Sequence, residues 1–420
     1  MTAPILLSTV GSHGDLFPVI AVARALEELG QPARLALSPE DALIARAHGL
    51  DAFDFGPSQT ELLDRLGLDP DGLARQIFRN PSPILTRGTY PMLADLAQRL
   101  IPEAQKARAV SATLLAMAAP LAAEVTRTPF IPLLLQPMLL RSALDPPRIP
   151  GFSPPMAAKP RSQATRTWNR AWLRVIDAEF SRRHARDQSR TRRDLGLPPT
   201  RAVPLFGHAA EPIAQLGLWD PAFSKAPPDR PVTLTGFPKP PGTPLPQDLL
   251  NFLNAGPAPF VVSLGSVSHN LGGPAFYSDC CALARSAGLR AVFLAGPSAT
   301  PNAPDLFTLP AASHDALFPR AAAVLHHGGI GTTGAACRAG IPQLIMPLGA
   351  DQPDNVARVE RAGIGRRIRR PSEAAADLAA ILSPETRDRA RDIAERLIPD
   401  GAATAARALL QAVEGGHSPL

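Results

Sequence analysis

Cysteine is scarce in this sequence: there are three in 420 residues, Cys280, Cys281 and Cys337. Three cysteines cannot form the disulfide framework that holds small secreted domains together, and none lies at zinc-binding spacing from other cysteines or histidines. The scarcity argues against zinc-finger and disulfide-rich classes. It favours a protein that works in the reducing cytoplasm.

Long apolar runs are also missing. The longest uncharged stretch, near residues 109–123, is too short to span a bilayer and contains Pro120. The first ten residues have no basic segment, so they predict a buried strand rather than a signal peptide. We therefore expect a cytoplasmic protein without a membrane-spanning helix.

Aromatic residues make up only 5% of the chain, although its net charge is +6. Between Lys159 and Arg193 there are 11 basic and 3 acidic residues. Without a recognition motif or interleaved aromatic side chains, this charge does not indicate nucleic-acid binding. Two interpretations stay open. Residues 159–193 form a solvated helical face, or they attract an acidic acceptor or the anionic lipid at the inner face of a membrane.

The N-terminal part alternates between strand and helix patterns. A strand at 4–10 leads into a glycine loop at 11–18 and a helix at 19–29, and strands follow at 34–37 and 52–55. Such alternation predicts a parallel α/β sheet, in which ligands bind at the carboxyl ends of the strands. Weak strand patterns also occur at 203–206 and 213–215.

Proline is abundant, and its densest run marks a boundary. Residues 238–246 contain five prolines, which cannot continue a helix or a central strand. The length predicts two or three domains. We expect an N-terminal α/β domain at 1–237, a linker at 238–246, and a C-terminal α/β domain at 247–420 that ends in a helical segment.

The most informative stretch is 324–355. Gly328, Gly329 and Gly331 follow an apolar strand and allow close approach of the backbone to a ligand. Thr332 and Thr333 then open a helix, whose free N–H groups favour a phosphate. His327 would donate a hydrogen bond to the same phosphate, or it is only a structural residue at the entry to the helix.

Two further groups suit a sugar nucleotide. Gly265 and Ser266 form a second small-residue turn after a strand, fit for a diphosphate. The polar cluster after the next strand holds Asp351, Gln352 and Asn355, whose carboxylate and amides suit sugar hydroxyls. The alternative for Asp351 and Gln352 is that they form a turn.

In the N-terminal loop, Asp15 and His13 are candidates for a general base that removes a proton from an acceptor hydroxyl. The alternatives are structural. Asp15 precedes a helix and would make a good N-cap, and His13 would be a hydrogen-bonded surface histidine.

A second function class also fits part of the pattern. Residues 329–334 match the dinucleotide fingerprint, and Asp351 lies where a ribose-binding acid would be, so an NAD- or FAD-dependent oxidoreductase is an alternative. The two histidines before the motif and the rich polar cluster after it count against this alternative. A non-catalytic sugar-nucleotide-binding partner of another transferase is a third possibility, but it would not need Asp15.

At these residues the sequence resembles the family 1 nucleotide-sugar glycosyltransferases of the GT-B fold, most of all the rhamnosyltransferases of rhamnolipid synthesis and the antibiotic and sterol glycosyltransferases. The family's donor signature corresponds here to His327, Gly328, Gly329, Thr332, Thr333, Asp351, Gln352 and Asn355. Its phosphate-contacting serine corresponds to Ser266. Its catalytic base lies in a pattern that here reads Gly14-Asp15-Leu16-Phe17-Pro18.

The resemblance implies two Rossmann-like domains whose parallel sheets face each other across a cleft. It implies an inverting hexosyl or deoxyhexosyl transfer from a UDP- or dTDP-sugar, with no metal and no cofactor beyond this co-substrate. Asp15, aided by His13, would be the base. The apolar and proline-rich segment at 129–150 favours a hydrophobic acceptor, either lipid-like or a natural product.

Overall fold

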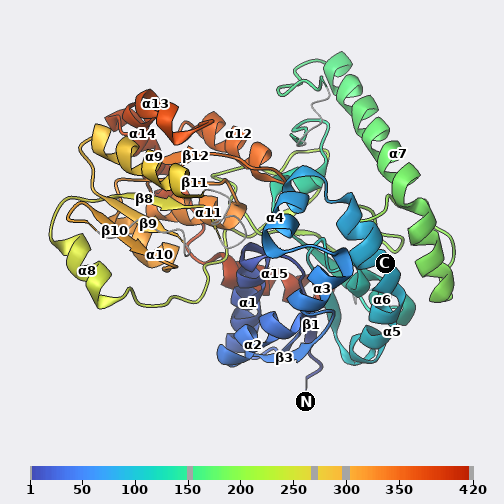
Figure 1. Ribbon diagram of the computed structural model, residues 1–420. Helices are drawn as coiled ribbons and strands as arrows, with labels where there is room; N and C mark the ends of the chain where they lie inside the picture. Colours follow the sequence, from blue (N-terminus) through green and yellow to red (C-terminus); the bar gives the residue numbers. More distant parts are fainter. Residues whose placement is uncertain (1, 149–154, 266–272, 296–302, 416–420) are drawn as a thin grey trace. The chain divides into compact units, whose positions relative to one another are not determined.

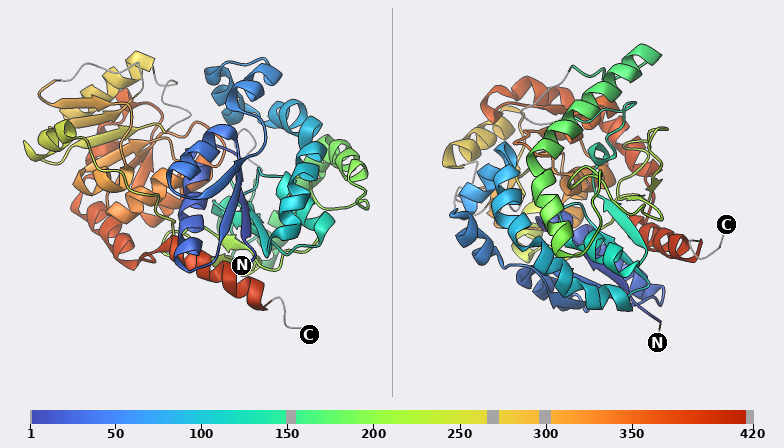
Figure 2. Two further views of the ribbon diagram at one scale, coloured as in Figure 1. Left: turned by 90° about the horizontal axis from the view of Figure 1, so that it is seen from below. Right: turned by 90° about the vertical axis from the view of Figure 1, so that its right-hand side faces the viewer.

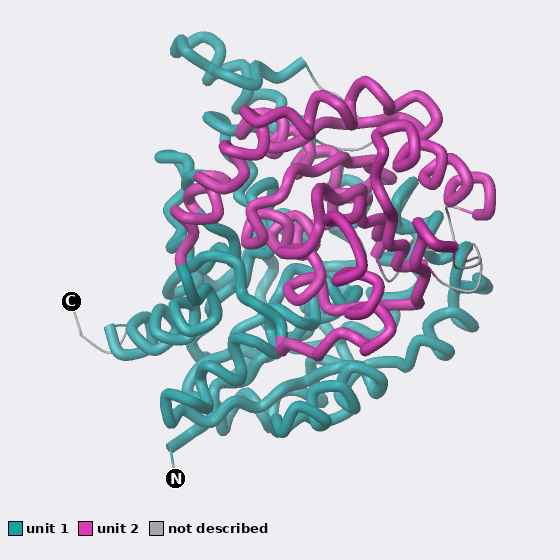
Figure 3. Tube along the Cα trace, turned by 90° about the vertical axis from the view of Figure 1, so that its left-hand side faces the viewer, with its two compact units in different colours: residues 1–220, 225–240, 399–420 teal, residues 221–224, 241–398 magenta. Residues whose placement is uncertain are grey.

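The computed structural model describes residues 2–148, 155–265, 273–295 and 303–415. These residues form two compact units, coloured separately in Figure 3. Unit 1 comprises residues 1–220, 225–240 and 399–420, and unit 2 comprises residues 221–224 and 241–398.

Unit 1 is built on a parallel sheet with strand order β3-β2-β1-β4-β5-β6-β7 (Figure 1). The strands are β1 (Ile5–Ser8), β2 (Ala33–Leu37), β3 (Asp51–Asp54), β4 (Ala109–Ala112), β5 (Phe130–Leu134), β6 (Leu216–Gly217) and β7 (Thr233–Leu234). All residues of β1, β4 and β5 are buried, as expected for central parallel strands that are covered on both faces.

The helices of unit 1 cover this sheet. They are α1 (His13–Glu28), α2 (Pro39–Ala47), α3 (Gln59–Leu66), α4 (Pro70–Arg79), η1 (Ile84–Thr89), α5 (Tyr90–Lys106), α6 (Ala118–Thr126), η2 (Pro137–Leu140), α7 (Gln163–Asp194) and α15 (Gly401–Gly415). Tyr90, Leu93, Ala97 and Leu100 of α5 share one apolar core with Leu6 and Val110 of the sheet. Within the described residues, no helix combines the length and the apolar character that a membrane crossing needs.

Unit 2 holds a second parallel sheet, with strand order β10-β9-β8-β11-β12-β13. Its strands are β8 (Phe260–Ser263), β9 (Ala291–Leu294), β10 (Leu306–Leu309), β11 (Ala323–His326), β12 (Gln343–Ile345) and β13 (Gly365–Arg367). Along β8, Phe260 and Val262 enter one core and Val261 enters the other, because successive side chains of a strand point to opposite faces.

The helices of unit 2 lie on both faces of that sheet. They are α8 (Gln247–Asn254), α9 (Gly273–Ser286), α10 (His314–Leu317), η4 (Phe318–Arg320), α11 (Ile330–Ala339), α12 (Gln352–Ala362), η5 (Pro371–Glu373), α13 (Ala375–Ile381) and α14 (Pro384–Arg396). The expected division near the proline run is close to the observed boundary, since the main change of unit falls between residues 240 and 241.

The C-terminal helix differs from the expectation. A place in the C-terminal domain is expected for it, but its contacts assign residues 399–420 to unit 1, where α15 packs against α1 (Figure 2). The buried face of α15 is made of small and aliphatic residues, among them Ala405 and Leu409. At its start, a Cβ on Gly401 would lie 2.6 Å from the carbonyl carbon and oxygen of Phe237, so glycine permits this approach.

Two local expectations were also wrong. The first helix starts at His13 rather than near residue 19, because Ser12 caps it and the segment 13–18 adopts helical geometry. The segments 203–206 and 213–215 are not strands, and the short strand β6 begins at Leu216, between β5 and β7. The predicted α/β class with two parallel-sheet units is confirmed.

Candidate active site

Each sheet reverses its strand order at one place, and the predicted site residues follow the strands at that place. In unit 1 the order turns between β1 and β4, and the loop with Asp15 follows β1. In unit 2 it turns between β8 and β11, and Gly265 and His327 follow these two strands. Ligands of open parallel sheets bind at such switch points. We call the two places the Asp15 site and the His327 site.

Asp15 is held at the start of α1 by a reciprocal cap. Its Oδ2 accepts hydrogen bonds from the backbone N–H of Ser12 at 2.8 Å and from the Ser12 hydroxyl at 3.1 Å. Within the described part of the chain, Oδ1 accepts none. Asp15 is therefore not the N-cap: Ser12 is, and Asp15 is the third helical residue, which completes the capping box through one oxygen. The other oxygen stays available, and a catalytic role for Asp15 stays a prediction.

The electrostatic setting of Asp15 suits a base. Burial raises the pKa of its carboxyl to about 6, and the nearby Asp41 adds to this rise, while the bonds from Ser12 oppose it. Gly11 makes the geometry feasible, because a Cβ at that position would lie 2.3 Å from Oδ2 of Asp15. The carboxylate is thus ionised at neutral pH and more basic than a free aspartate.

His13 has a different setting. It is the first residue of α1, it is exposed, and its ring lies 5.3 Å from that of Phe17. Its charge helps to lower the pKa of Asp41, against the larger effect of burial, which raises it. No hydrogen bond joins His13 to Asp15 in the described structure, so a catalytic role for His13 stays a prediction.

A cavity of about 910 Å³ lies in unit 1 and reaches its switch point. Thr113, which follows β4, lines the cavity, and its hydroxyl lies 2.8 Å from that of Thr9, which follows β1. The Thr9 hydroxyl also donates to the backbone carbonyl of Asp15 at 3.4 Å. Through these two hydrogen bonds, Thr113 at one end of the cavity is connected to the backbone of Asp15.

The cavity wall is mainly apolar, with Leu93, Met117, Leu121, Phe130, Leu134, Leu140 and Phe206 among its residues. Four charged side chains of the wall form two ion pairs with each other. Arg192 binds Glu124 through two bonds of 2.8 and 2.7 Å, and Arg141 forms an ion pair with Asp177. Tyr90 contributes a buried hydroxyl for which the described residues provide no hydrogen-bond partner.

In unit 2, His327 is enclosed by two glycine turns. A Cβ on Gly265 would lie 2.6 Å from Cε1 of His327, and a Cβ on Gly329 would lie 2.5 Å from Nε2. Any larger residue at either position would displace the imidazole ring. The structure thus brings together Gly265, His327 and Gly329, whereas Ser266 lies outside the described residues.

The imidazole of His327 is neutral. Burial, with a smaller contribution from His314, lowers the pKa of His327 to about 4. The backbone of Ser263 opposes this lowering, but among the described residues the buried Nδ1 has no partner at hydrogen-bond geometry. A buried polar atom without a partner is costly in a folded protein, so this nitrogen is a candidate for contact with a ligand.

The other histidines of the cluster have structural partners. His326 is fully buried, lies 3.0 Å through Nε2 from Oε1 of Gln343, and accepts from the Gly328 N–H at 3.1 Å. His326 is thus a buried residue at the end of β11. His314 lies 3.1 Å from the Ser263 hydroxyl and stacks on Phe318.

Helix α11 starts directly after the glycine turn, with Gly329 as its N-cap. Thr333 donates its hydroxyl back to the Gly329 carbonyl at 3.0 Å, so this hydroxyl is used inside the helix. Thr332 makes no such bond in the described structure, and Gly331 is exposed. The hydroxyl pair predicted for donor binding therefore divides into one free and one occupied group.

The polar cluster at the start of α12 is tied to the same turn. Asn355 donates to the Gly328 carbonyl at 3.0 Å and to Asp351 at 2.6 Å, while its own Oδ1 is buried without a partner. Gln352 uses Oε1 to hold the N–H groups of Leu348 and Gly349, at 2.6 and 3.1 Å. Its amide nitrogen has no protein partner in the described structure.

Asp354, in the same cluster, has a structural role. It forms an ion pair of 2.7 Å with Arg358, and the two side chains are 4% and 2% exposed. Arg358 also donates to the Ser224 hydroxyl at 2.7 Å, which ties residues 221–224 to unit 2.

Because removal of one partner leaves a buried charge uncompensated, we expect Asp354→Asn to destabilise unit 2 by about 3 kcal/mol. Urea unfolding of the whole chain would measure this loss. The matched control is Asp388→Asn, which breaks an exposed pair with Arg391 in the same unit. That variant should stay within about 0.5 kcal/mol of the wild type, and equal losses for both variants would contradict the argument.

Sequence reasoning missed Thr9, Thr113 and Tyr90. No motif marks them, because their relevance comes from the switch point and the cavity, which only the folded sheet defines. It also treated Thr332 and Thr333 alike. A helix-opening threonine pair has no sequence signal that tells which hydroxyl bonds back to the turn.

The comparisons with known proteins concern the fold and the family of the chain. Residues 304–408 match the family model described as the C-terminal domain of erythromycin biosynthesis protein CIII-like proteins. Among solved structures, the glycotransferase of kitacinnamycin is 18% identical with a TM-score of 0.69, and covers 98% of this chain and 100% of its own. Glycosyltransferase VinC in complex with DTDP is 20% identical with a TM-score of 0.68, with the same coverage of 98% and 100%. These likenesses confirm the predicted GT-B fold.

Two relatives from Amycolatopsis orientalis match almost the whole chain. Glycosyltransferase GtfC is 33% identical over 97% of both chains. The vancomycin aglycone glucosyltransferase is 32% identical, again over 97% of both chains. The chain therefore belongs to family 1 of the glycosyltransferases with the GT-B fold, the family of the antibiotic glycosyltransferases.

Proposed function

We propose that this protein is an inverting transferase that moves a hexosyl or deoxyhexosyl group from a nucleoside-diphosphate sugar to a hydroxyl of a hydrophobic acceptor. The observation that carries the proposal is Asp15, whose carboxylate follows β1 at the switch point of unit 1. It has one anchored and one available oxygen, and burial raises its pKa to about 6. A base of this strength suits deprotonation of a hydroxyl near neutral pH.

In the proposed reaction, Oδ1 of Asp15 takes the proton of the acceptor hydroxyl. The acceptor oxygen then forms a bond to the anomeric carbon while the bond from that carbon to the diphosphate breaks. The electron pair of the broken bond leaves with the nucleoside diphosphate. A single displacement of this kind inverts the anomeric configuration.

The His327 site supplies groups for the leaving diphosphate. His327 offers a neutral imidazole, Thr332 offers a hydroxyl, and the first turn of α11 offers N–H groups that no carbonyl of the helix accepts. These donors act most strongly where charge grows during bond breaking, so they lower the barrier as well as bind the donor. Gln352 and Asp351 would contact the sugar, and Asn355 would fix the turn.

Thymidine diphosphate is the nucleotide that we favour over uridine diphosphate. Support comes from solved structures of the same fold, namely VinC in complex with DTDP and the spinosyn rhamnosyltransferase SpnG complexed with thymidine diphosphate. We further propose that neither a metal nor a resident cofactor takes part. The diphosphate charge would then be balanced by the protein donors alone.

The cavity of unit 1 is our candidate for the acceptor pocket. Its volume of about 910 Å³ lies at the upper end of pockets for drug-sized molecules, and its wall is mainly apolar. A bulky natural-product aglycone or a lipid-like alcohol fits this character. The buried Tyr90 hydroxyl would give such an acceptor one hydrogen-bond donor.

The two threonines of α11 provide a matched test of the donor site. We expect Thr332→Val to lower kcat/KM for the donor about tenfold or more. The substitution removes the threonine hydroxyl and with it a hydrogen bond to the charged diphosphate. Thr333→Val should leave donor kinetics nearly unchanged, because its hydroxyl is bound to the Gly329 carbonyl. Donor-concentration series of nucleoside diphosphate release measure both values. A reversed order would place the phosphate elsewhere.

The function itself is tested with a panel of dTDP- and UDP-hexoses. Thermal shift measures binding, and release of the nucleoside diphosphate measures transfer of the sugar to water or to a phenolic acceptor. We expect stabilisation by dTDP and transfer from a dTDP-sugar, with an inverted anomeric centre in the product. If NAD or FAD stabilised the protein and no sugar nucleotide did, the oxidoreductase alternative would replace this proposal. Binding of sugar nucleotides without any turnover would favour the non-catalytic partner.

A further inference from the structure

The N-terminal half of α7 carries an exposed face that the proposed reaction does not use. Trp168, Ala171, Val175 and Ala178 follow one another at helical spacing of three or four residues, so they lie on one side of the helix. All four are exposed, Trp168 at 49% and Val175 at 52%. We call these four residues, with the neighbouring Arg174 and with Arg170 at the border of the buried side, the α7 face.

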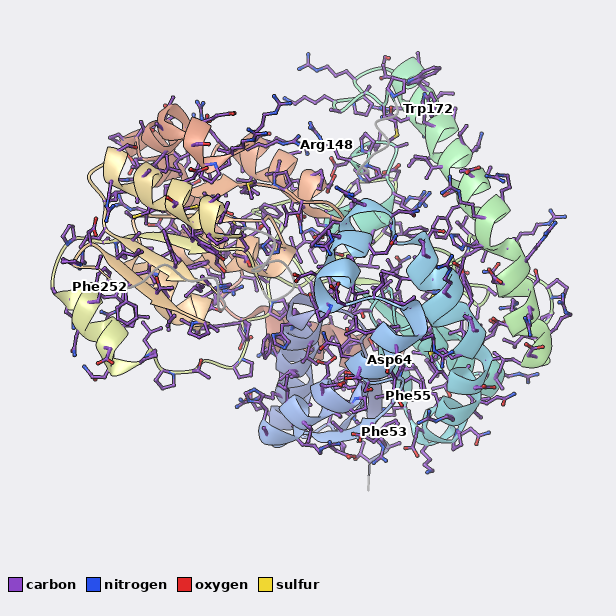
Figure 4. The ribbon with its side chains drawn as sticks, in the orientation of Figure 1. Phe53, Phe55, Asp64, Arg148, Trp172 and Phe252 are labelled. Atoms are coloured by element: carbon purple, nitrogen blue, oxygen red, sulfur yellow. The ribbon has the colours of Figure 1, made fainter. Side chains whose placement is uncertain are left out.

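The opposite side of this half-helix is buried. Asn169 and Leu173 are covered by unit 1, and Asn169 donates to the Ala143 carbonyl at 2.9 Å. The α7 face therefore points away from the core of its own unit. Trp172, labelled in Figure 4, lies next to it, with its ring centroid 6.0 Å from that of Trp168. Two of the three tryptophans of the chain thus lie on this half of α7.

The charge around the face has one sign. Residues 159–176 include five basic residues and no acidic one. Arg170 and Arg174 are exposed, and neither has a carboxylate partner in the described structure. Helix α14 shows the contrast, because its Arg389, Arg391 and Arg396 each pair with an acidic residue of the same helix.

Further along the same side, Arg182 is paired with Glu179 at 2.8 Å, whereas Arg186 and Arg193 are exposed without a carboxylate partner in the described structure. The face thus joins an apolar strip with a tryptophan to a row of guanidinium groups. Tryptophan prefers the boundary between the head groups and the acyl chains of a bilayer, and clustered arginine is attracted to anionic head groups. A nucleic acid would use the positive charge but would gain little from the exposed Val175 and alanines.

We propose that the α7 face binds the surface of an anionic lipid bilayer, with Trp168 and Val175 at the level of the head groups. This goes beyond the proposed function and does not depend on it. The same helix lines the cavity through Asp177, Gln188 and Thr191. Docking by this face would therefore hold the cavity of unit 1 close to the lipid, where apolar acceptors concentrate.

The experiment is co-sedimentation of the full chain with phosphatidylcholine vesicles, with and without phosphatidylglycerol. We expect binding only to the vesicles that contain phosphatidylglycerol, with a blue shift of tryptophan fluorescence and weaker binding at high salt. The double variant Arg170→Glu/Arg174→Glu should lose at least about tenfold in vesicle affinity. Arg389→Glu/Arg391→Glu on α14 changes the net charge equally and should lose much less.

Several outcomes would overturn the proposal. One is a wild-type protein that does not sediment with anionic vesicles at low salt. Another is an equal loss for the α7 and the α14 double variants, which would show that only net charge matters. Unchanged vesicle affinity of Trp168→Ser would also overturn it, and so would binding of duplex DNA through this face in place of vesicles. Circular dichroism checks that each variant is folded, and none of these measurements requires donor or acceptor turnover.

Discussion

Replacement of Asp15 by asparagine should lower kcat by about 10²- to 10⁴-fold, the usual contribution of a general base. Asparagine has nearly the same shape and keeps an oxygen that can accept the two hydrogen bonds from Ser12. It cannot take a proton from an acceptor hydroxyl. The binding of a nucleoside diphosphate, measured by thermal shift, should stay unchanged because those groups belong to the His327 site.

Two controls separate the base from its scaffold. His13→Ala should lower kcat far less than Asp15→Asn, since His13 is exposed and makes no hydrogen bond to Asp15 in the described structure. Gly11→Ala should also lower kcat, because its Cβ would lie 2.3 Å from Oδ2 of Asp15 and would shift the carboxylate. If Asp15→Asn transferred sugar at the wild-type rate, Asp15 would only cap α1.

Replacement of His327 by alanine should have the second-largest effect. We expect kcat/KM for the donor to fall by about 10²-fold, as is typical when one donor to a developing negative charge is removed. The imidazole is already neutral at pH 7, because burial lowers its pKa to about 4, so the loss concerns a hydrogen bond rather than a full charge. Initial rates over a range of donor concentrations measure the effect.

The folding of the His327 variant needs its own check, since the ring fills the space between Gly265 and Gly329. His327→Gln fills part of that space and offers an amide N–H, so it should recover part of the lost kcat/KM. A nucleoside diphosphate should stabilise the alanine variant less than the wild type in a thermal-shift assay. Equal stabilisation of both would place the diphosphate away from His327.

Much of the fold could be predicted from sequence because the signals were local. The apolar runs at β1 and β11, each followed by a glycine turn, define strand ends whatever surrounds them. The proline run near 238–246 likewise acts through its own backbone and marked the main boundary almost correctly. The glycines around His327 were recognisable for the same reason, since their small size is a property of the sequence itself.

The remaining features depend on contacts that sequence does not encode locally. The helix α15 belongs to unit 1 because its small residues fit against α1, and a run of alanines does not reveal its partner. The oxygen of Gln352 holds the loop at Leu348 and Gly349, a contact that no sequence pattern marks. Asp354 has a structural role because it forms a buried ion pair with Arg358. Each of these roles is set by a neighbour in space.

The pH dependence of kcat/KM tests the central claim most directly, because it reports the ionisation of the free enzyme. The measurement is sugar transfer or donor hydrolysis by the wild type and by Asp15→Asn. Burial raises the pKa of Asp15 to about 6, and a base works only when ionised, so the wild-type rate should fall as pH drops through about 6. The residual rate of Asp15→Asn should show no such limb. A wild-type rate that stays flat down to about pH 5, or a limb shared by the asparagine variant, would contradict the assignment of Asp15 as the base.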